Sequence, residues 1–192
     1  MIKDLVLQNR SYRKYHNHKK VTQKQLLDLV DLARITPSSK NRQPLKYILV
    51  TDNHDVGFVF SQLKWAWYLK KWDGPAKDEQ PPSYIIMCID KDLNDHALID
   101  CGIAAQTILL GAAEQKLGGC IIRTVNRYAI SKHFKLPPNI EVVQVIAIGY
   151  PNQNVELTAI DNDGSINYFE NSEGIHYVPK RKLEDIIIQP GN

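Results

Sequence analysis

One segment constrains the fold more than any other: residues 94–117 have the length of a helix, and their apolar and small side chains leave little polar surface on any side. Apolar residues fall on every side of a helix drawn through it: Ile99, Ile103, Ala104, Ile108, Leu110 and Ala113. A helix that is hydrophobic all round is expected to be buried over nearly its whole surface. Small residues such as Gly102 and Gly111 would let a second helix approach closely. The segment therefore predicts either a central core helix or a helix at a subunit interface.

The length and composition fit one folded domain around such a helix. The chain has 192 residues, of which 43% are hydrophobic and 23% charged, and this balance excludes intrinsic disorder. Its formal net charge is only +3, so the strong basic field of a nucleic-acid binder is missing. No apolar run approaches the roughly 20 residues of a membrane span, and no secretory signal opens the chain. We expect a cytoplasmic protein without membrane or nucleic-acid partners.

Apolar periodicity and helix-ending residues divide the rest of the chain into alternating helices and strands. Thr22 and Gln25 have the spacing of a capping box, and they open a helix that ends near Pro37. The run at residues 141–151 is apolar on both faces, which is typical of an interior strand in a sheet covered by helices. Further helices are expected at residues 2–9, from 55 onward and at 126–134, and further strands at 47–51, 84–90 and 120–125. This order predicts an α+β or α/β domain.

Other segments are harder to place. Gly118 and Gly119 are expected to end the apolar helix. The aromatic residues at 65–72 form no single stripe and fit either the core or the roof of a binding slot. From residue 152 the composition turns polar, NDGS at 162–165 is a turn signal, and the terminal VPKRKLEDIII has no clear place in a core. Such a tail needs another surface to pack against.

Isolated polar and reactive residues favour ordinary structural roles. The three cysteines form no CxxC pair and lie in apolar segments, so we expect reduced, buried thiols: Cys88, Cys101 and Cys120. His16 and His18 could ligate a metal, but they have no evident third ligand, and we expect no metal site. Asp100 and Gln106 on the apolar helix are expected to serve each other.

Three polar segments are not explained by packing: NRSYRKY at residues 9–15, PSSKNRQP at 37–44 and PKRK at 179–182. Arginine offers paired donors with a permanent charge, and serine adds a hydroxyl, which together suit a phosphate monoester. The hydroxyls and amides of the second segment suit a sugar chain or a polar ring. Taken singly, each segment also fits a solvated turn, an ordinary loop or a surface cluster.

The order of these segments resembles the FMN-dependent nitroreductase family. RSYR is followed about 25 residues later by PSSKNRQP, and then by GIAAQ, LGG, AIGYP and PKRKLEDI. The resemblance extends from about residue 8 to residue 188. It implies an α+β protein with a three-layer α/β/α fold, in which helices flank a mixed, mainly antiparallel sheet. It further implies one domain over residues 1–192 in an intertwined homodimer, with residues 152–192 as a C-terminal extension that packs on the partner subunit.

The resemblance also assigns roles to single residues. Residues that match the FMN phosphate grip come from both ends of the chain: Arg10, Ser11, Arg13, Lys180 and Arg181. Loop residues that would reach the ribityl chain and ring of the flavin in the other subunit are Pro37, Ser38, Ser39, Asn41 and Gln43. Gly118 and Gly119 match a glycine segment that runs close to the flavin ring. Asn9 stands where many members have a second arginine, and Lys182 stands where many have proline, so the phosphate partner among residues 180–182 stays open.

The implied chemistry needs no catalytic side chain, because the flavin itself carries the hydride. NADH or NADPH would reduce FMN at N5, and a small acceptor such as a nitroaromatic compound or a quinone would then take its place in a ping-pong cycle. A specialised flavin reductase or a reductive dehalogenase would use the same scaffold. A flavin-binding protein without turnover and an RNA-binding domain based on the two basic ends are the alternatives from other classes.

Overall fold

The computed structural model describes residues 1–69, 72–160 and 164–190, and these fall into two units of very different size. The first unit consists of Met1–Trp65 and Gly74–Asn152, and the second of Ala66–Asp73 and Gln153–Asn192. Within the described ranges, no helix combines the length and apolar character that crossing a membrane requires. The first unit contains both hydrophobic cores of the protein.

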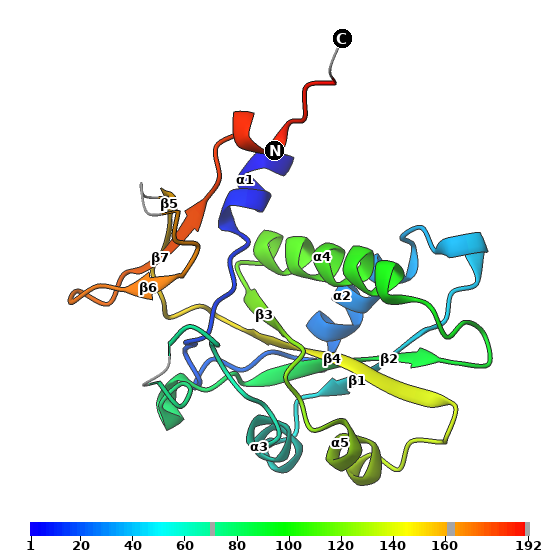
Figure 1. Ribbon diagram of the computed structural model, residues 1–192. Coiled ribbons are helices and arrows are strands. Elements are labelled where there is room, and N and C mark those ends of the chain that lie inside the picture. Colours follow the sequence, from blue (N-terminus) through cyan, green and yellow to red (C-terminus); the bar gives the residue numbers. More distant parts are fainter. Residues whose placement is uncertain (70–71, 161–163, 191–192) are drawn as a thin grey trace. The chain divides into compact units, whose positions relative to one another are not determined.

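A four-stranded antiparallel sheet is the centre of the first unit (Figure 1). Its strands, in spatial order, are β1 (Leu45–Val50), β2 (Ser83–Asp90), β4 (Ile140–Gly149) and β3 (Gly118–Ile122). The two middle strands, β2 and β4, are buried over almost their whole length. The sequence prediction of an interior strand at residues 141–151 is therefore confirmed, because β4 has hydrogen-bonded neighbours on both sides.

Helices cover both faces of this sheet and complete three layers (Figure 1). On one face lie α2 (Gln23–Arg34) and α4 (Leu98–Glu114), and on the other lie α3 (Asn53–Ser61) and α5 (Arg127–His133). Alternate sheet residues feed the two cores: Ile85 of β2 packs with α2 and α4, whereas its neighbour Ile86 packs on the opposite side. The expected α/β/α arrangement of an α+β protein is confirmed.

Side-chain caps begin three of these helices, two of them, at Thr22 and Asn126, where the sequence predicts them. The Gln25 N–H donates to Thr22 Oγ1 at 3.2 Å, and the Thr22 N–H donates to the Gln25 side chain at 3.0 Å, which is a complete capping box. The Ala129 N–H donates to Asn126 Oδ1 at 3.2 Å at the start of α5. Asp52 caps α3 in the same manner. Each cap satisfies backbone donors that a helix start leaves without partners.

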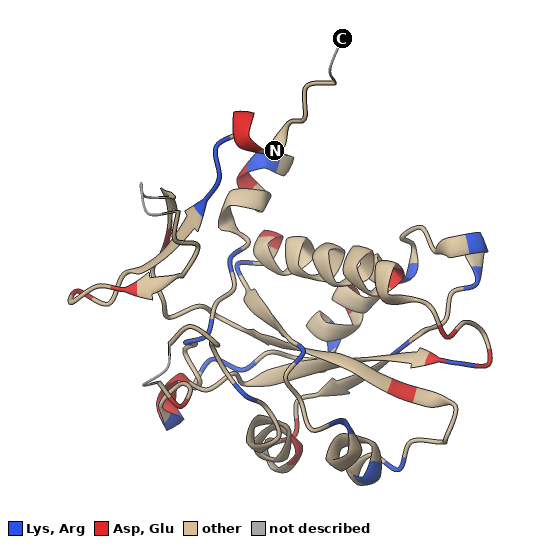
Figure 2. Cartoon of the chain, viewed as in Figure 1, with Lys and Arg blue, Asp and Glu red and all other residues tan. Residues whose placement is uncertain are grey.

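Helix α4 differs from its prediction in length and in burial. It begins at Leu98 rather than near residue 94, and it is buried on one side only. Ala104, Ala105 and Ile108 are fully buried, whereas Leu98 is 59% and Ile99 78% exposed. Figure 2 shows that the helix carries no charge between the acidic residues near its two ends. The expectation of burial on all sides is thus wrong for one chain, because α2 and the sheet cover only one side of the helix. The other side exposes an apolar stripe that includes Leu98 and Ile99.

The glycine pair after α4 also differs from its prediction. Gly118 and Gly119 do not end the helix, which stops at Glu114; Lys116, with φ of 58°, makes the turn instead. The two glycines begin β3, where a Cβ on Gly118 would collide with the Tyr12 ring. A Cβ on Gly119 would lie 2.6 Å from the Ala147 carbonyl oxygen. The chain's own packing therefore requires glycine at both positions.

The second unit is a small sheet that the sequence does not predict. Its order is β5 (Val155–Ala159), β7 (His176–Lys180) and β6 (Phe169–Glu170), with β5 and β7 parallel. The terminal segment that had no expected place thus contributes β7. The aromatic segment is divided between the two units, because Trp65 is the last residue of one part of the first unit and Trp67 belongs to the second. The Trp67 side chain is 83% exposed and lies outside both hydrophobic cores described above. Residues 70–71 of that segment and residues 162–163 of the predicted turn lie outside the described residues.

All three cysteines are buried and unpaired, as predicted. Burial raises the pKa of the Cys88 thiol to about 12 and that of Cys101 to about 11, and it also raises the pKa of Cys120. Since only the thiolate attacks, we expect no reaction with an aromatic disulfide reagent in the native protein at pH 8 and three reacting thiols after unfolding in guanidinium. Rapid labelling of the native protein would contradict this.

Candidate functional site

The N-terminal motif is held against the edge of β3. After α1 (Ile2–Gln8) the chain runs alongside this strand, where Ser11 and Gly119 form a parallel bridge. The Tyr12 N–H donates to the Gly119 carbonyl at 3.1 Å. Arg13 follows in the same segment, and its Nη1 donates to the Ser11 carbonyl at 3.3 Å. The predicted phosphate residues Arg10, Ser11 and Arg13 are thus fixed next to the predicted glycine pair.

Arg10 shows the clearest sign of a missing ligand. Its side chain is partly buried, and its Nη2 donates to the Val6 carbonyl at 2.6 Å. Its Nε is fully shielded from solvent and has no hydrogen-bond acceptor. A buried guanidinium N–H without an acceptor is costly, so a shift of this partly exposed side chain that brings Nε to a phosphate oxygen would be favourable. Ser11 is exposed and can add a hydroxyl to the same ligand.

The loop at residues 37–44 is held by a buried carboxylate on α4. Ser38 Oγ donates to Asp100 Oδ2 at 2.6 Å, and the Ser39 N–H donates to Asp100 Oδ1 at 3.2 Å. The Gln43 N–H donates in turn to Ser38 Oγ at 3.0 Å, so the loop folds around the Ser38 hydroxyl. The expectation that Asp100 and Gln106 serve each other is wrong, because Asp100 bonds the loop and Gln106 is exposed. Asp100 is the positioning residue that sequence reasoning missed.

Removal of this anchor gives a testable prediction. Replacing Asp100 by alanine should lower the free energy of unfolding by about 1.5–3 kcal/mol, since the Ser38 hydroxyl and the Ser39 N–H lose a charged acceptor. Urea denaturation measures the change. Lys132→Ala, an exposed change on α5 on the opposite face of the sheet, is the control and should unfold like the parent protein. Equal stability of the two variants would show that Asp100 does not hold the loop.

A pocket of about 390 Å³ opens between α2, the loop and β1. Three of the five predicted loop residues, Pro37, Ser38 and Gln43, line it. The other two, Ser39 and Asn41, are exposed on the outside of the loop. Left-handed backbone at Lys40, Asn41 and Gln43, with φ between 50° and 55°, bends the loop around the pocket rim.

The predicted cofactor residues of one chain fall at opposite ends of α4 (Figure 1). The loop is tied to Asp100 in the first turn of the helix, whereas the N-terminal motif lies at Gly119, just after its last turn. At 1.5 Å per residue, Asp100 and Glu114 are about 20 Å apart along the helix axis. A flavin mononucleotide is shorter than this distance. This separation favours two different flavins for the two groups of one chain.

The C-terminal cations belong to the second unit. Lys180 is the last residue of β7 and Arg181 follows it, and both side chains are exposed. Their convergence with Arg10 and Arg13 on one phosphate stays a prediction.

Comparison with known proteins places this geometry in a family. The model of the nitroreductase family matches residues 6–150, which is nearly the whole first unit. A protein of Archaeoglobus fulgidus, provisionally named NADH dehydrogenase/NAD(P)H nitroreductase, is 24% identical over 171 residues. The match covers 82% of this chain and 90% of that relative.

Solved structures agree with this assignment. A nitroreductase family protein from Clostridium difficile is 25% identical with a TM-score of 0.64, and the match covers 80% of this chain and 85% of that chain. A nitroreductase family protein from Streptococcus pneumoniae has a TM-score of 0.73 at 14% identity and supports the fold alone. It covers 99% of this chain and 100% of its own, so the likeness in fold includes the second unit.

Proposed function

The chain belongs to the nitroreductase family of oxidoreductases, and on that basis we propose that it is an FMN-dependent enzyme that passes hydride from NADH or NADPH to a small acceptor. A nitroaromatic compound or a quinone would be such an acceptor. The donor would leave before the acceptor enters, in a ping-pong cycle. The observation that carries the cofactor assignment is the buried Arg10 Nε without an acceptor, which lies where the sequence motif predicts the flavin phosphate.

Residues from different parts of the chain would bind different parts of FMN. Arg10, Ser11 and Arg13 would bind the phosphate from the edge of β3, and Lys180 and Arg181 would add positive charge from the second unit. Gly118 and Gly119 keep Tyr12 and the N-terminal motif close to that edge, and the flavin ring would lie near them. Bound FMN would supply the hydride chemistry, so that the protein has only to orient the reactants and exclude water.

The second half of each site would come from a partner subunit. The loop residues that would line the ribityl chain and ring lie at the far end of α4 from the phosphate motif of their own chain: Pro37, Ser38, Ser39, Asn41 and Gln43. A twofold axis that crosses α4 near its middle, perpendicular to the helix, would bring one end of the helix beside the other end of its copy. The exposed apolar stripe of α4, with Leu98 and Ile99, supplies a surface for such a dimer. We propose a homodimer with two FMN sites, in which residues 152–192 pack on the partner.

The identity of the cofactor tests this proposal directly. The purified protein should be yellow, and heat denaturation should release a flavin whose mass is that of FMN, at one per chain. Release of FAD or riboflavin would contradict the phosphate assignment. A colourless protein that does not bind added FMN would contradict the proposal as a whole.

A further inference from the structure

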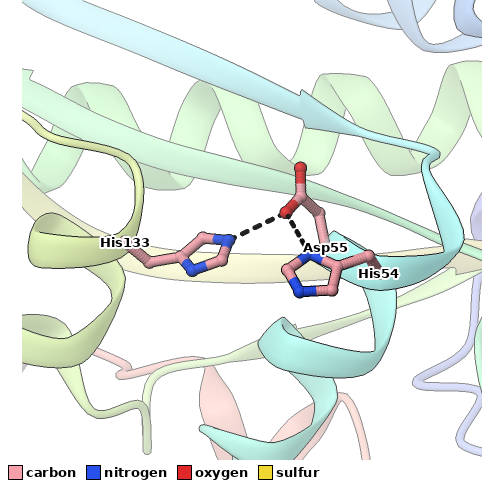
Figure 3. Close-up of side chains that lie close together, drawn as sticks. All are labelled: His54, Asp55 and His133. Atoms are coloured by element: carbon pink, nitrogen blue, oxygen red, sulfur yellow. Dashed lines mark hydrogen bonds and ion pairs between the residues drawn. The ribbon is translucent and has the colours of Figure 1, made fainter.

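Two histidines and an aspartate from distant parts of the sequence meet on the sheet face opposite α4. His54 and Asp55 lie in the first turn of α3, and His133 is the last residue of α5 (Figure 3). His133 Nε2 lies 2.8 Å from Asp55 Oδ1, and His54 Nδ1 lies 3.3 Å from the same oxygen. One ligand atom from each residue lies within 4.8 Å of the other two. Among the described residues, this is the group of three that could hold a metal ion.

Local structure holds the three side chains in place. The Asp52 carboxylate accepts hydrogen bonds from the His54 and Asp55 N–H groups at 2.9 and 3.4 Å, which fixes the first turn of α3. The His133 ring stacks on Phe58 with 3.8 Å between centroids and 11° between planes. The side chains of Asp55 and His133 are 35% and 23% exposed, whereas that of His54 is 82% exposed. Two ligands are therefore partly shielded, and the third borders open solvent.

The donor set selects the class of ion. Two imidazole nitrogens and one carboxylate oxygen suit Zn²⁺ and similar transition metals, whereas Mg²⁺ and Ca²⁺ prefer oxygen ligands alone. With metal–ligand bonds of about 2.0–2.1 Å, neighbouring donor atoms of a tetrahedral site lie about 3.3 Å apart. The separation of His54 Nδ1 from Asp55 Oδ1 equals that value, whereas His133 Nε2 lies closer, at 2.8 Å. Small rotations of the side chains would therefore let the three donor atoms turn from one another toward a common ion.

We propose that His54 Nδ1, Asp55 Oδ1 and His133 Nε2 bind one Zn²⁺ ion, with water in the fourth position on the exposed His54 side. On binding, a neutral ring moves its proton to its other nitrogen, and a charged ring releases one proton to solvent. The ion links α3 to α5 and so ties together the helices of one layer. The sequence expectation of no metal site considered only His16 and His18. It did not consider this group, because Asp55 and His133 are 78 residues apart and form no sequence motif.

Calorimetric titration of the EDTA-dialysed protein with Zn²⁺ tests the site. We expect one ion bound per chain, no binding of Mg²⁺, and a higher melting temperature with Zn²⁺. His54→Ala removes an exposed ligand without opening the core, and Asp55→Asn keeps the shape but removes the charge. Each should weaken Zn²⁺ binding at least about tenfold. Both variants should retain the flavin content of the parent, because these residues lie outside the flavin site, so this test is independent of the proposed function.

Two matched controls separate this site from other histidines. His96 is exposed and lies 3.6 Å from Asp95, so His96→Ala tests whether a single surface histidine–carboxylate pair suffices. The double variant His16→Ala, His18→Ala tests the HxH pair, whose rings lie 5.6 Å apart. Both should bind Zn²⁺ like the parent. The proposal is overturned if the parent binds no Zn²⁺, if His54→Ala binds it unchanged, or if either control variant loses it.

Discussion

Replacing Arg10 by alanine should lower the affinity of the protein for FMN about 10-fold to 100-fold. The reason is that a charge-assisted hydrogen bond to phosphate contributes roughly 1.5–3 kcal/mol, and the Arg10 Nε already lies buried without an acceptor. Quenching of flavin fluorescence during titration of the cofactor-free protein measures the change. The hydrogen bond that the Arg10 side chain donates within the protein goes to the Val6 carbonyl of the preceding helix, and urea denaturation of the variant shows whether its loss also lowers stability.

Riboflavin is the matched control ligand, since it has the same ring and sugar chain but lacks the phosphate. The parent and Arg10→Ala should bind riboflavin equally. Lys3→Ala, an exposed change on the preceding helix, should leave FMN binding unaltered. An unchanged FMN affinity for Arg10→Ala would show that the phosphate grip is misassigned. An equal loss for both ligands would mean that the substitution disturbs the fold instead.

If the proposed homodimer forms through α4, replacing Ile99 by glutamate should convert it into monomers that bind no flavin. Ile99 lies in the first turn of α4, belongs to its apolar stripe and is 78% exposed in one chain. If this stripe is the dimer interface, the substitution buries an unpaired charge, which costs several kcal/mol, and twofold symmetry places that charge in the interface twice. Loss of flavin should accompany dissociation, because each site needs the loop of the other subunit. Sedimentation velocity and flavin absorbance measure the two effects.

Tyr128→Glu is the matched control for this change. Tyr128 is 77% exposed on α5, on the opposite face of the sheet, so the same kind of substitution there should leave both mass and colour unaltered. A parent protein that is monomeric while binding FMN would contradict the shared site. So would an Ile99→Glu dimer with full flavin content.

Local sequence signals predict those parts of the fold that depend on neighbouring residues. Thr22 and Asn126 cap helices through contacts three residues away, and the double-sided apolar run of β4 marks an interior strand without reference to any other segment. Local sequence does not predict which side of α4 is buried, because this depends on where α2, a distant segment, packs against the helix. In the second unit, β5 alternates apolar and polar residues over only five positions, and β6 has two residues, so these strands are too short for a pattern to stand out in a polar segment.

The candidate site shows the same division. The N-terminal motif and the loop are recognisable as contiguous segments, and in the structure Ser11 of the first forms a bridge with Gly119. The carboxylate that holds the loop is not recognisable, because Asp100 and Ser38 are 62 residues apart. The family motif points to Gly119 because a side chain there would meet the flavin ring. The structure gives another reason for glycine, because a Cβ at this position would collide with the Ala147 carbonyl of the neighbouring strand.

The central claim is that a bound flavin accepts hydride from a nicotinamide and passes it on. Anaerobic titration of the purified yellow protein with NADH and, separately, with NADPH tests it most directly. We predict that at least one donor bleaches the oxidised flavin absorbance at one equivalent per chain, and that a nitroaromatic compound or a quinone then restores the colour. A yellow protein that neither nicotinamide reduces would contradict the claim and indicate a flavin-binding protein without turnover.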